Sequence, residues 1–191
     1  MKEILWIRHA QSIGNAGIPT DSASSFPLSP LGVEQAQMLA EKIPFTPDLI
    51  VSSPFRRAWE TAAPTSARYP SVSMEIWPEV HEFTYLSPAS CVGTTTADRR
   101  PRVLDYWARL DPDYLDGGDA ETFRNVVRRA ELAIEHIQSR WEQHIVIFSH
   151  EQFIKCVELT LRAPDLPVEE KMRSFPTLPP IRNCEMIPLH L

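Results

Sequence analysis

Three short segments of this sequence place arginine, serine and histidine side chains directly after runs of apolar residues. They are Arg8-His9, Ser52–Arg57 and Ser149-His150. An arginine recognises phosphate oxygens with a planar fork of donors and does not lose its charge. A neutral imidazole beside it can attack the group that the arginine holds. These residue types indicate phosphoryl chemistry, with Arg8 and His9 as the first candidate reaction centre.

The apolar runs before these segments predict buried β-strands, because each run is short and rich in bulky residues. The runs are Ile4–Ile7, Leu49–Val51 and Ile145–Phe148. The carboxyl ends of parallel strands meet at one edge of a sheet, where open α/β folds place their ligand sites. Taken singly, a histidine at a strand end is a hydrogen-bonded structural residue, and Arg56 or Arg57 belongs to a solvated helix face. The coincidence of all three segments at one edge favours a shared crevice.

Helix patterns lie between these strands. Ser29-Pro30 is typical of an N-cap followed by proline in the first turn, and it predicts a helix over Leu31–Ile43. Ser53-Pro54 repeats the pattern and predicts a helix through Ala62, which Pro64 ends or kinks. Further helices are predicted over Arg102–Leu110, Asp119–Trp141 and His150–Leu161. One apolar stripe at helical spacing marks the longest of them: Phe123, Val126, Val127, Ala130, Ala133, Ile134, Ile137 and Trp141.

Two weaker strand patterns complete the sequence. They cover Met74–Trp77 and Met186–Leu189, and the second is expected at a sheet edge because Pro188 lacks a backbone donor. Alternation of strands and helices predicts an α/β fold, a three-layer α/β/α sandwich whose mostly parallel central sheet has helices on both faces. We expect a single domain over residues 1–191.

Composition limits the classes of function. The chain has 191 residues, of which 43% are hydrophobic and 23% charged, as in an ordinary globular protein. A net charge of −6 gives no support to nucleic-acid binding, which usually leaves a basic footprint. We expect no membrane span and no signal peptide. The scattered residues Cys91, Cys156 and Cys184 indicate reduced thiols in a cytoplasmic protein, which we expect to be a monomer or homodimer.

An ordered series of motifs resembles the histidine phosphatase superfamily, in its phosphoglycerate-mutase-like branch 1. Residues 8–15, Arg8-His9-Ala10-Gln11-Ser12 with Asn15, are similar to that family's R-H-G-E-x-x-x-N motif. The other matching segments are Leu28–Ala36, Ser52–Ala62, Glu79–Phe83, Gly117–Glu121 and Val146–His150. The resemblance implies a phosphoglycerate-mutase-like fold, and it spans residues 4 to 150 in order.

The resemblance also implies roles for particular residues. His9 is the implied nucleophile that becomes phosphohistidine, and Arg8, Arg57 and His150 line the implied phosphate pocket. Glu82 is the implied proton donor to the leaving group and then the base for water; Glu79 is its rival, with a poorer match in spacing. Asn15 belongs to the implied substrate-binding residues. A histidine nucleophile needs no metal, so no cofactor is expected. Attack requires a neutral His9, whereas His150 would work best as a cation.

The sequence departs from the family pattern at three positions near the implied site, two of them by mild changes. Ala10 and Gln11 stand where the family usually has glycine and glutamate, and Glu151 stands where it has glycine. Glu151 either disfavours a second phosphate and favours a substrate amine, or it is an acidic residue suited to a helix N-terminus. The segment 84–118 is expected to be irregular apart from its one helix, and it would cover the site in this family. Its Arg99, Arg100 and Arg102 either grip a distal anion of the substrate or form a solvated loop.

These observations predict a metal-independent phosphatase of the histidine acid phosphatase type, a phosphoric monoester hydrolase acting on a small phosphorylated substrate. One alternative is a phosphoglycerate-type phosphomutase, but the E-R-H-Y-G stretch of the family's mutases corresponds here to Glu82–Leu86. A second alternative is a non-catalytic protein that binds phosphorylated ligands. A metal-dependent hydrolase fits less well, because His136 and His144 are expected to lack carboxylate or cysteine partners.

Overall fold

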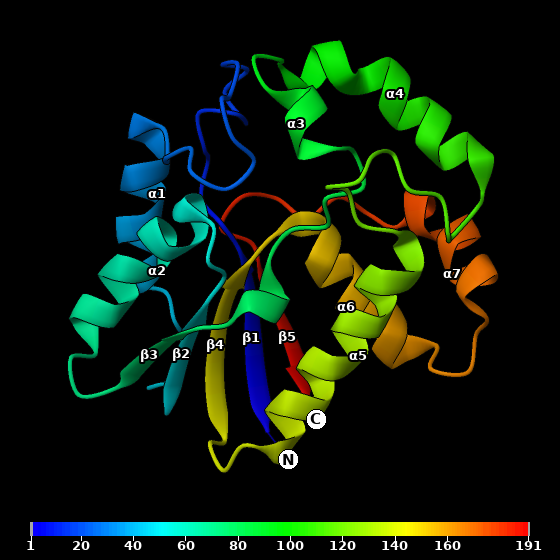
Figure 1. Cartoon of the computed structure of the whole chain (residues 1–191). Helices are drawn as coiled ribbons and strands as arrows, with labels where there is room; N and C mark the ends of the chain where they lie inside the picture. Colours follow the sequence, from blue (N-terminus) through cyan, green and yellow to red (C-terminus); the bar gives the residue numbers. More distant parts are fainter. Residues whose placement is uncertain (1, 191) are drawn as a thin grey trace.

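A computed structural model describes residues 2–190 as a five-stranded sheet between two layers of helices (Figure 1). Across the sheet the strand order is β3-β2-β4-β1-β5. The strands are β1 (Glu3–Arg8), β2 (Leu49–Ser52), β3 (Ser73–Ile76), β4 (His144–Ser149) and β5 (Met186–His190). All neighbours are parallel except β5, which runs antiparallel to β1 at the sheet edge. The predicted α/β/α sandwich and the edge position of residues 186–189 are therefore confirmed.

Alternating side chains of the strands build two apolar layers, because successive residues of a strand point to opposite faces. On one face, Ile4 and Trp6 of β1 join the core beneath α5 (Phe123–Ser139) and α6 (Glu151–Arg162). On the other face, Leu5 and Ile7 join a smaller core with residues of α1 (Pro30–Ala40) and α2 (Arg56–Arg68). Figure 1 shows these two helix pairs on opposite sides of the sheet. The strands are thus covered on both faces, as a parallel sheet requires.

Helix α1 begins where the sequence predicts, whereas helix α2 does not. The Ser29 hydroxyl accepts a hydrogen bond from the backbone N–H of Gly32 and caps α1 as predicted. By contrast, α2 begins only at Arg56, because the Ser53 hydroxyl instead contacts His150 and the Phe55 N–H. The helix also continues past Pro64 to Arg68, with buried residues on both sides of the proline. The predicted start at Ser53 and end near Ala62 are therefore wrong.

The longest helix, α5, begins at Phe123 after the N-cap Thr122 and ends at Ser139. Seven of the eight residues in the predicted stripe are buried against the core. The exception is Trp141, which lies beyond the helix end and is 77% exposed. Its assignment to the apolar stripe was wrong, because the helical pattern extends past the last hydrogen-bonded turn.

The segment 84–118, called here the cap segment, is more helical than its sequence indicates. It contains α3 (Pro88–Cys91) and α4 (Thr96–Arg109), which lie above the sheet edge that carries the strand ends (Figure 1). A capping box between Thr95 and Asp98 starts α4 six residues before the predicted position, and Pro101 lies inside the helix. Further short elements are η1 (Pro78–Val80), α7 (Val168–Ser174) and η2 (Phe175–Thr177); α7 has no counterpart in the sequence prediction.

The three cysteines carry free thiols; Cys156 is buried, whereas Cys91 and Cys184 are half-buried. Burial raises the pKa of the Cys156 thiol to about 12 and that of Cys184 to about 11. Within residues 2–190, the helices are all too short or too polar to cross a membrane.

Candidate active site

The segments that carry Arg8-His9, Ser52–Arg57 and Ser149-His150 meet at one edge of the sheet. In the parallel register, Arg8 of β1 lies beside Ser149 of β4, and Ser52 of β2 lies beside Phe148. Backbone hydrogen bonds extend this order past the strand ends: the His9 N–H donates to the Ser149 carbonyl at 3.0 Å, and the Ser53 N–H to the Phe148 carbonyl at 2.9 Å. Sheet pairing therefore brings the side chains of the three segments into one crevice.

His9 is held in one tautomer by its two partners. Its Nδ1 atom lies 2.7 Å from the Ala10 carbonyl oxygen, which only accepts hydrogen bonds. Its Nε2 atom lies 3.1 Å from Nε of Arg57, which only donates. The proton is therefore on Nδ1, and Nε2 keeps its lone pair. Burial lowers the pKa of His9 well below its usual range, and the charges of Arg57 and Arg8 lower it further.

His150 lies directly beside this imidazole. The ring centroids of His9 and His150 are 5.1 Å apart in an edge-on arrangement. The Nε2 atom of His150 lies 2.8 Å from the Ser53 hydroxyl, whereas its buried Nδ1 atom has no partner among the described residues. Burial, followed by the charge of Arg57, lowers the pKa of His150 well below its usual range. These surroundings favour the neutral form of His150, so a charged His150 would need a negative charge beside it.

Arg57 is a buried cation at the centre of the site. Besides its contact with His9, its Nη1 atom donates to the Ala23 carbonyl at 2.8 Å. The guanidinium carbon lies 4.4 Å from the ring centre of Phe26 and 5.0 Å from that of Phe55. Burial lowers the pKa of Arg57 to about 10, so the group is still charged at neutral pH. Arg56 is half-exposed and pairs with Glu60, so Arg57 is the member of this adjacent pair that lies in the site.

Glu82, not Glu79, lies in the site. The Oε1 atom of Glu82 accepts from the backbone N–H groups of Phe83 at 2.9 Å and Phe153 at 3.2 Å. Burial raises the pKa of this carboxyl, against the opposing charge of Arg57. Glu79 instead lies 2.6 Å from Nδ1 of His136, on the outer side of η1. A carboxyl with a raised pKa beside a cation can hold a proton for transfer.

Arg8 lies at the end of β1 and is paired. Its Nη1 atom donates to the Ile181 carbonyl and lies 2.9 Å from Oε2 of Glu151. The other carboxylate oxygen of Glu151 lies 3.0 Å from Nζ of Lys155, one turn along α6. Glu151 does stand in the first turn of α6, as expected for an acidic residue there, but its main contact is with Arg8. The buried Nε atom of Arg8 has no partner among the described residues.

Asn15 lies in the exposed loop after β1. Its Oδ1 atom accepts from the N–H and hydroxyl of Ser12 and from Nδ2 of Asn183, at 3.1–3.2 Å. The same Nδ2 atom of Asn183 donates to the His9 carbonyl at 2.8 Å. Sequence reasoning missed Asn183, which lies in an irregular segment with no motif around it.

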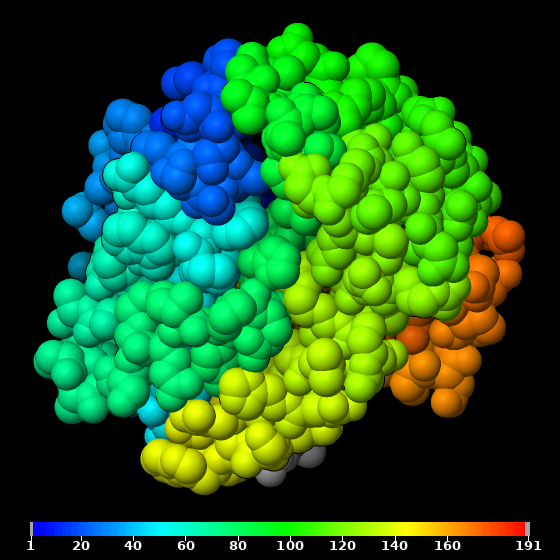
Figure 2. Space-filling model, viewed as in Figure 1, coloured from blue at the N-terminus to red at the C-terminus, as the bar shows by residue number. Residues whose placement is uncertain are grey.

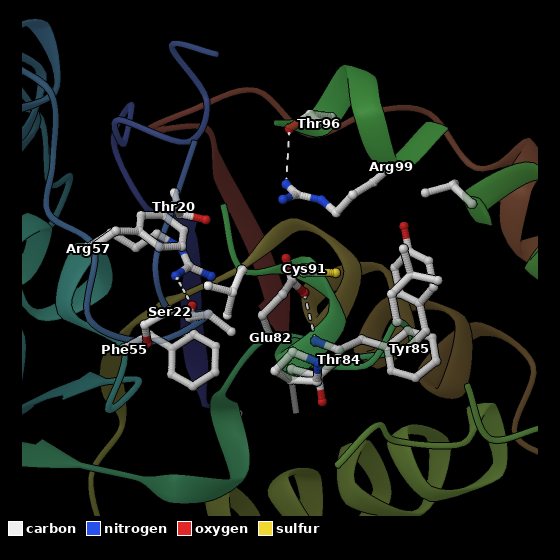
Figure 3. Close-up of a pocket in the computed structure, with 17 residues that line it drawn as sticks. Thr20, Ser22, Phe55, Arg57, Glu82, Thr84, Tyr85, Cys91, Thr96 and Arg99 are labelled. Carbon is white, nitrogen blue, oxygen red and sulfur yellow. Dashed lines mark hydrogen bonds between the residues drawn. The ribbon is translucent and has the colours of Figure 1, made fainter. Parts of the chain in front are cut away.

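A cavity lies between the sheet edge and the cap segment. It encloses about 820 Å³, including open solvent at its mouth, and its lining comes from the loop after β1, from residues 55–57 and from residues 82–103. Figure 2 shows the opening as a hollow between the blue N-terminal loop and the green cap segment. Figure 3 shows Arg57 and Glu82 on one side of this space and Arg99 of α4 on the other.

The three arginines of the cap segment have different surroundings. Arg99 lines the cavity. Arg102 forms an ion pair with Asp116 at 2.5 Å and also contacts Ser90, so it holds the cap segment together. Arg100 is exposed on the surface of α4.

Histidines and carboxylates outside the site form pairs, contrary to the sequence expectation. His136 contacts Glu79, and His144 lies 3.3 Å from Asp48. The expectation that both histidines lack carboxylate partners was wrong, because their partners come from distant loops. Among residues 2–190, no three histidine, cysteine or carboxylate side chains are grouped as they would be around a metal ion.

The family model of the histidine phosphatase superfamily (branch 1) matches residues 4–178. The chain therefore belongs to this superfamily. An uncharacterized protein of Mycobacterium tuberculosis is 29% identical to it over 158 residues, which cover 81% of this chain and 76% of that protein.

Solved structures of the same fold include several phosphatases. Mycobacterial glucosyl-3-phosphoglycerate phosphatase with VO3 is 25% identical, with a TM-score of 0.78 over 100% of this chain and 93% of that one. Phosphoserine phosphatase of Entamoeba histolytica shares the fold at 20% identity, with a TM-score of 0.76 over 98% and 90% of the two chains. Alpha-ribazole phosphatase of Shigella flexneri does so at 23% identity, with a TM-score of 0.71 over 95% and 86%.

Proposed function

We propose that this protein is a metal-independent phosphatase that hydrolyses a small phosphomonoester through a phosphohistidine at His9. The observation that carries the proposal is the fixed tautomer of His9. The Ala10 carbonyl fixes the proton on Nδ1, and Nε of Arg57 donates to Nε2. The lone pair is therefore on Nε2 of a buried, neutral imidazole that lies beside two arginines. Such a nitrogen is an activated nucleophile for the phosphoryl group that the arginines attract.

In the proposed first step, Nε2 of His9 forms a bond to phosphorus while the bond from phosphorus to the ester oxygen breaks. The departing oxygen keeps the bond's electron pair and takes a proton from Glu82. The Nε–H group of Arg57, which donates to Nε2 of His9 in the structure, would donate to a phosphoryl oxygen once the substrate has entered. The two buried atoms without partners, Nε of Arg8 and Nδ1 of His150, would then gain oxyanion acceptors, and the phosphoryl charge would favour a protonated His150.

In the proposed second step, Glu82 is a carboxylate and accepts a proton from water as that water attacks phosphorus. The bond between Nε2 and phosphorus breaks, inorganic phosphate leaves, and Glu82 is again protonated. The reaction needs no group beyond the side chains described, since positioned positive charge is the main requirement of phosphoryl transfer.

The test is turnover of 4-nitrophenyl phosphate by the wild-type chain and by His9→Ala, each with EDTA present. We expect wild-type turnover to persist in EDTA and His9→Ala to lose at least about 10³-fold, because the nucleophile is absent. Quenching the reaction of ³²P-labelled substrate with alkaline detergent should trap a phosphoprotein in the wild type alone, and the label should be stable to base and released by later treatment with acid.

The matched control is His144→Asn, a half-buried histidine at the opposite end of β4, which should keep full activity. Turnover by His9→Ala at the wild-type rate would refute the phosphohistidine, and an acid-stable label would assign the phosphoryl group to another residue. Phosphate binding without any turnover would show a non-catalytic binding protein instead.

A further inference from the structure

We propose that Arg99 is a subsite for a second oxyanion, so that the substrate is a phosphomonoester with an apolar body and a distal carboxylate or phosphate. This inference rests on the proposed function for the phosphoryl end of the molecule. It concerns the opposite side of the same cavity, where the reaction itself requires no charge.

The cavity has charge at two places with an apolar wall between them. Its charged lining residues are Arg57 and Glu82 beside the nucleophile, and Arg99 in the first turn of α4. The apolar wall between them includes Phe26, Phe55, Leu86, Val92 and Val103. An apolar ligand body with charge at one end only would leave the Arg99 cation in this cavity without a counter-ion. A ligand charged at both ends matches the lining.

The guanidinium of Arg99 is held in place but has donors left over. Its Nη1 atom donates to the carbonyl and hydroxyl oxygens of Thr94, each at 3.0 Å, and its Nη2 atom has one long contact of 3.4 Å with the Thr96 hydroxyl. Its Nε atom has no hydrogen bond, and the side chain has no ion pair, within the described residues 2–190. Figure 3 shows this guanidinium directed from α4 toward the cavity.

The unused donors are the pair that binds carboxylates elsewhere in this protein. Nε and Nη2 of Arg109 both contact Asp105, at 3.1 and 2.7 Å. Nε and Nη2 of Arg124 likewise contact the two oxygens of Asp113, at 2.7 and 2.9 Å. This two-pronged geometry suits a carboxylate or a phosphate. The same pair of donors in Arg99 contacts no carboxylate among the described residues, and Glu82 is the one acidic residue of the cavity lining.

Neighbouring arginines provide the contrast. Arg102 is neutralised by Asp116, and Arg100 lies on the exposed surface of the helix. Of these three arginines, only Arg99 combines a position in the cavity wall with a charge that has no ion pair among residues 2–190. The two threonines that fix Nη1 and Nη2 also reduce the entropy lost when an anion binds.

The experiment compares three kinds of phosphate ester: phenyl phosphate, carboxyphenyl phosphate in its meta and para isomers, and phenylene bisphosphate. We expect the wild type to favour at least one of the doubly charged esters about tenfold or more in kcat/KM. The carboxylate and bisphosphate compounds identify which oxyanion the subsite takes. Arg99→Gln should abolish this preference and leave kcat/KM for phenyl phosphate within about twofold.

Arg100→Gln is the matched control and should keep the wild-type preference, whereas Arg99→Lys should keep only part of it because the fork is lost. An equal kcat/KM for all three esters in the wild type, or an equal loss on all three in Arg99→Gln, would overturn the subsite. Calorimetry can also measure the affinity of the same esters for His9→Ala and for the double variant His9→Ala with Arg99→Gln. This comparison tests the subsite without any turnover. Failure of the proposed reaction is therefore distinguishable from failure of the subsite.

Discussion

The Nη1 atom of Arg8 lies 2.9 Å from Oε2 of Glu151, so one of the two arginines beside His9 is already paired with a carboxylate. Lys155 contacts the other oxygen of Glu151 and orients the carboxylate. The two members of the pair are only 15% and 19% exposed, which limits screening by solvent. An incoming phosphoryl dianion must therefore share Arg8 with a resident negative charge.

Glu151→Gln should strengthen binding of anions at the site. Removing one charge a few ångströms from the phosphate position is worth about 1 kcal/mol in a partly exposed setting, or about a fivefold lower Ki for inorganic phosphate. The amide oxygen still accepts from Arg8, so the guanidinium keeps its position. Competitive inhibition of 4-nitrophenyl phosphate hydrolysis measures Ki.

Glu158→Gln is the matched control, since Glu158 lies two turns further along α6 and pairs with the exposed Arg162. Its Ki for phosphate should equal that of the wild type. A weaker inhibition by phosphate in Glu151→Gln would show that the carboxylate is needed to position Arg8 and outweighs its repulsion.

Glu82→Gln should lower kcat/KM most for the esters that have the poorest leaving groups. An alkoxide needs the proton that Glu82 supplies, whereas 4-nitrophenolate departs without one. We expect a loss of about 10²–10⁴-fold in kcat/KM for an alkyl phosphate and a much smaller loss for 4-nitrophenyl phosphate.

The pH profile provides a second measurement on the same variant. Burial raises the pKa of Glu82, so its acid form persists to higher pH than in water and is lost on the alkaline side. The wild-type kcat/KM for alkyl esters should fall with rising pH through this pKa, and Glu82→Gln should lack that limb. Glu79→Gln, the rival acid paired with His136, should retain both the rate and the limb. The reverse pattern would move the acid to Glu79.

The buried histidines make the fold sensitive to acid. Burial lowers the pKa of His150 well below that of an unfolded histidine, so the unfolded state binds a proton first as pH falls below about 6.5. Its contribution to the free energy of unfolding is complete above that pH. The contribution is then lost at up to about 1.4 kcal/mol per pH unit until the folded histidine titrates.

Urea unfolding of the wild type and His150→Gln at a series of pH values between 7 and 5 isolates this contribution. Glu82, whose raised pKa has the opposite sign, is common to both chains and cancels in the comparison. The wild type should lose more stability than the variant over this range. Parallel curves would mean that His150 is protonated in the folded state.

The strand ends were the most predictable part of this molecule. Each apolar run is too short for a helix and is followed by a polar residue, so β1, β2 and β4 and their common edge follow from local pattern. Arg8, His9, Arg57, Glu82 and His150 therefore meet where the sequence places them.

Contacts between distant segments were not predictable. Nothing near Glu151 in the sequence indicates Arg8 as its partner, and Asn183 reaches the His9 carbonyl from an irregular segment. In the cap segment, the Thr95–Asp98 capping box outweighs the helix-breaking tendency of Pro101, so α4 begins early and turns Arg99 toward the cavity. Such outcomes depend on tertiary packing, which a single sequence does not display.

The antiparallel strand β5 has a consequence for biosynthesis. Cys184 and Glu185 form backbone hydrogen bonds with Arg8, and Ile187 and Leu189 flank β1, so the strand that carries His9 acquires its second neighbour from residues 181–190. Its first neighbour, β4, is itself more than a hundred residues away. Synthesis must therefore reach β5 before β1 has both of its neighbours. His9 is thus synthesised more than a hundred residues before β4 and β5, the two strands that flank β1.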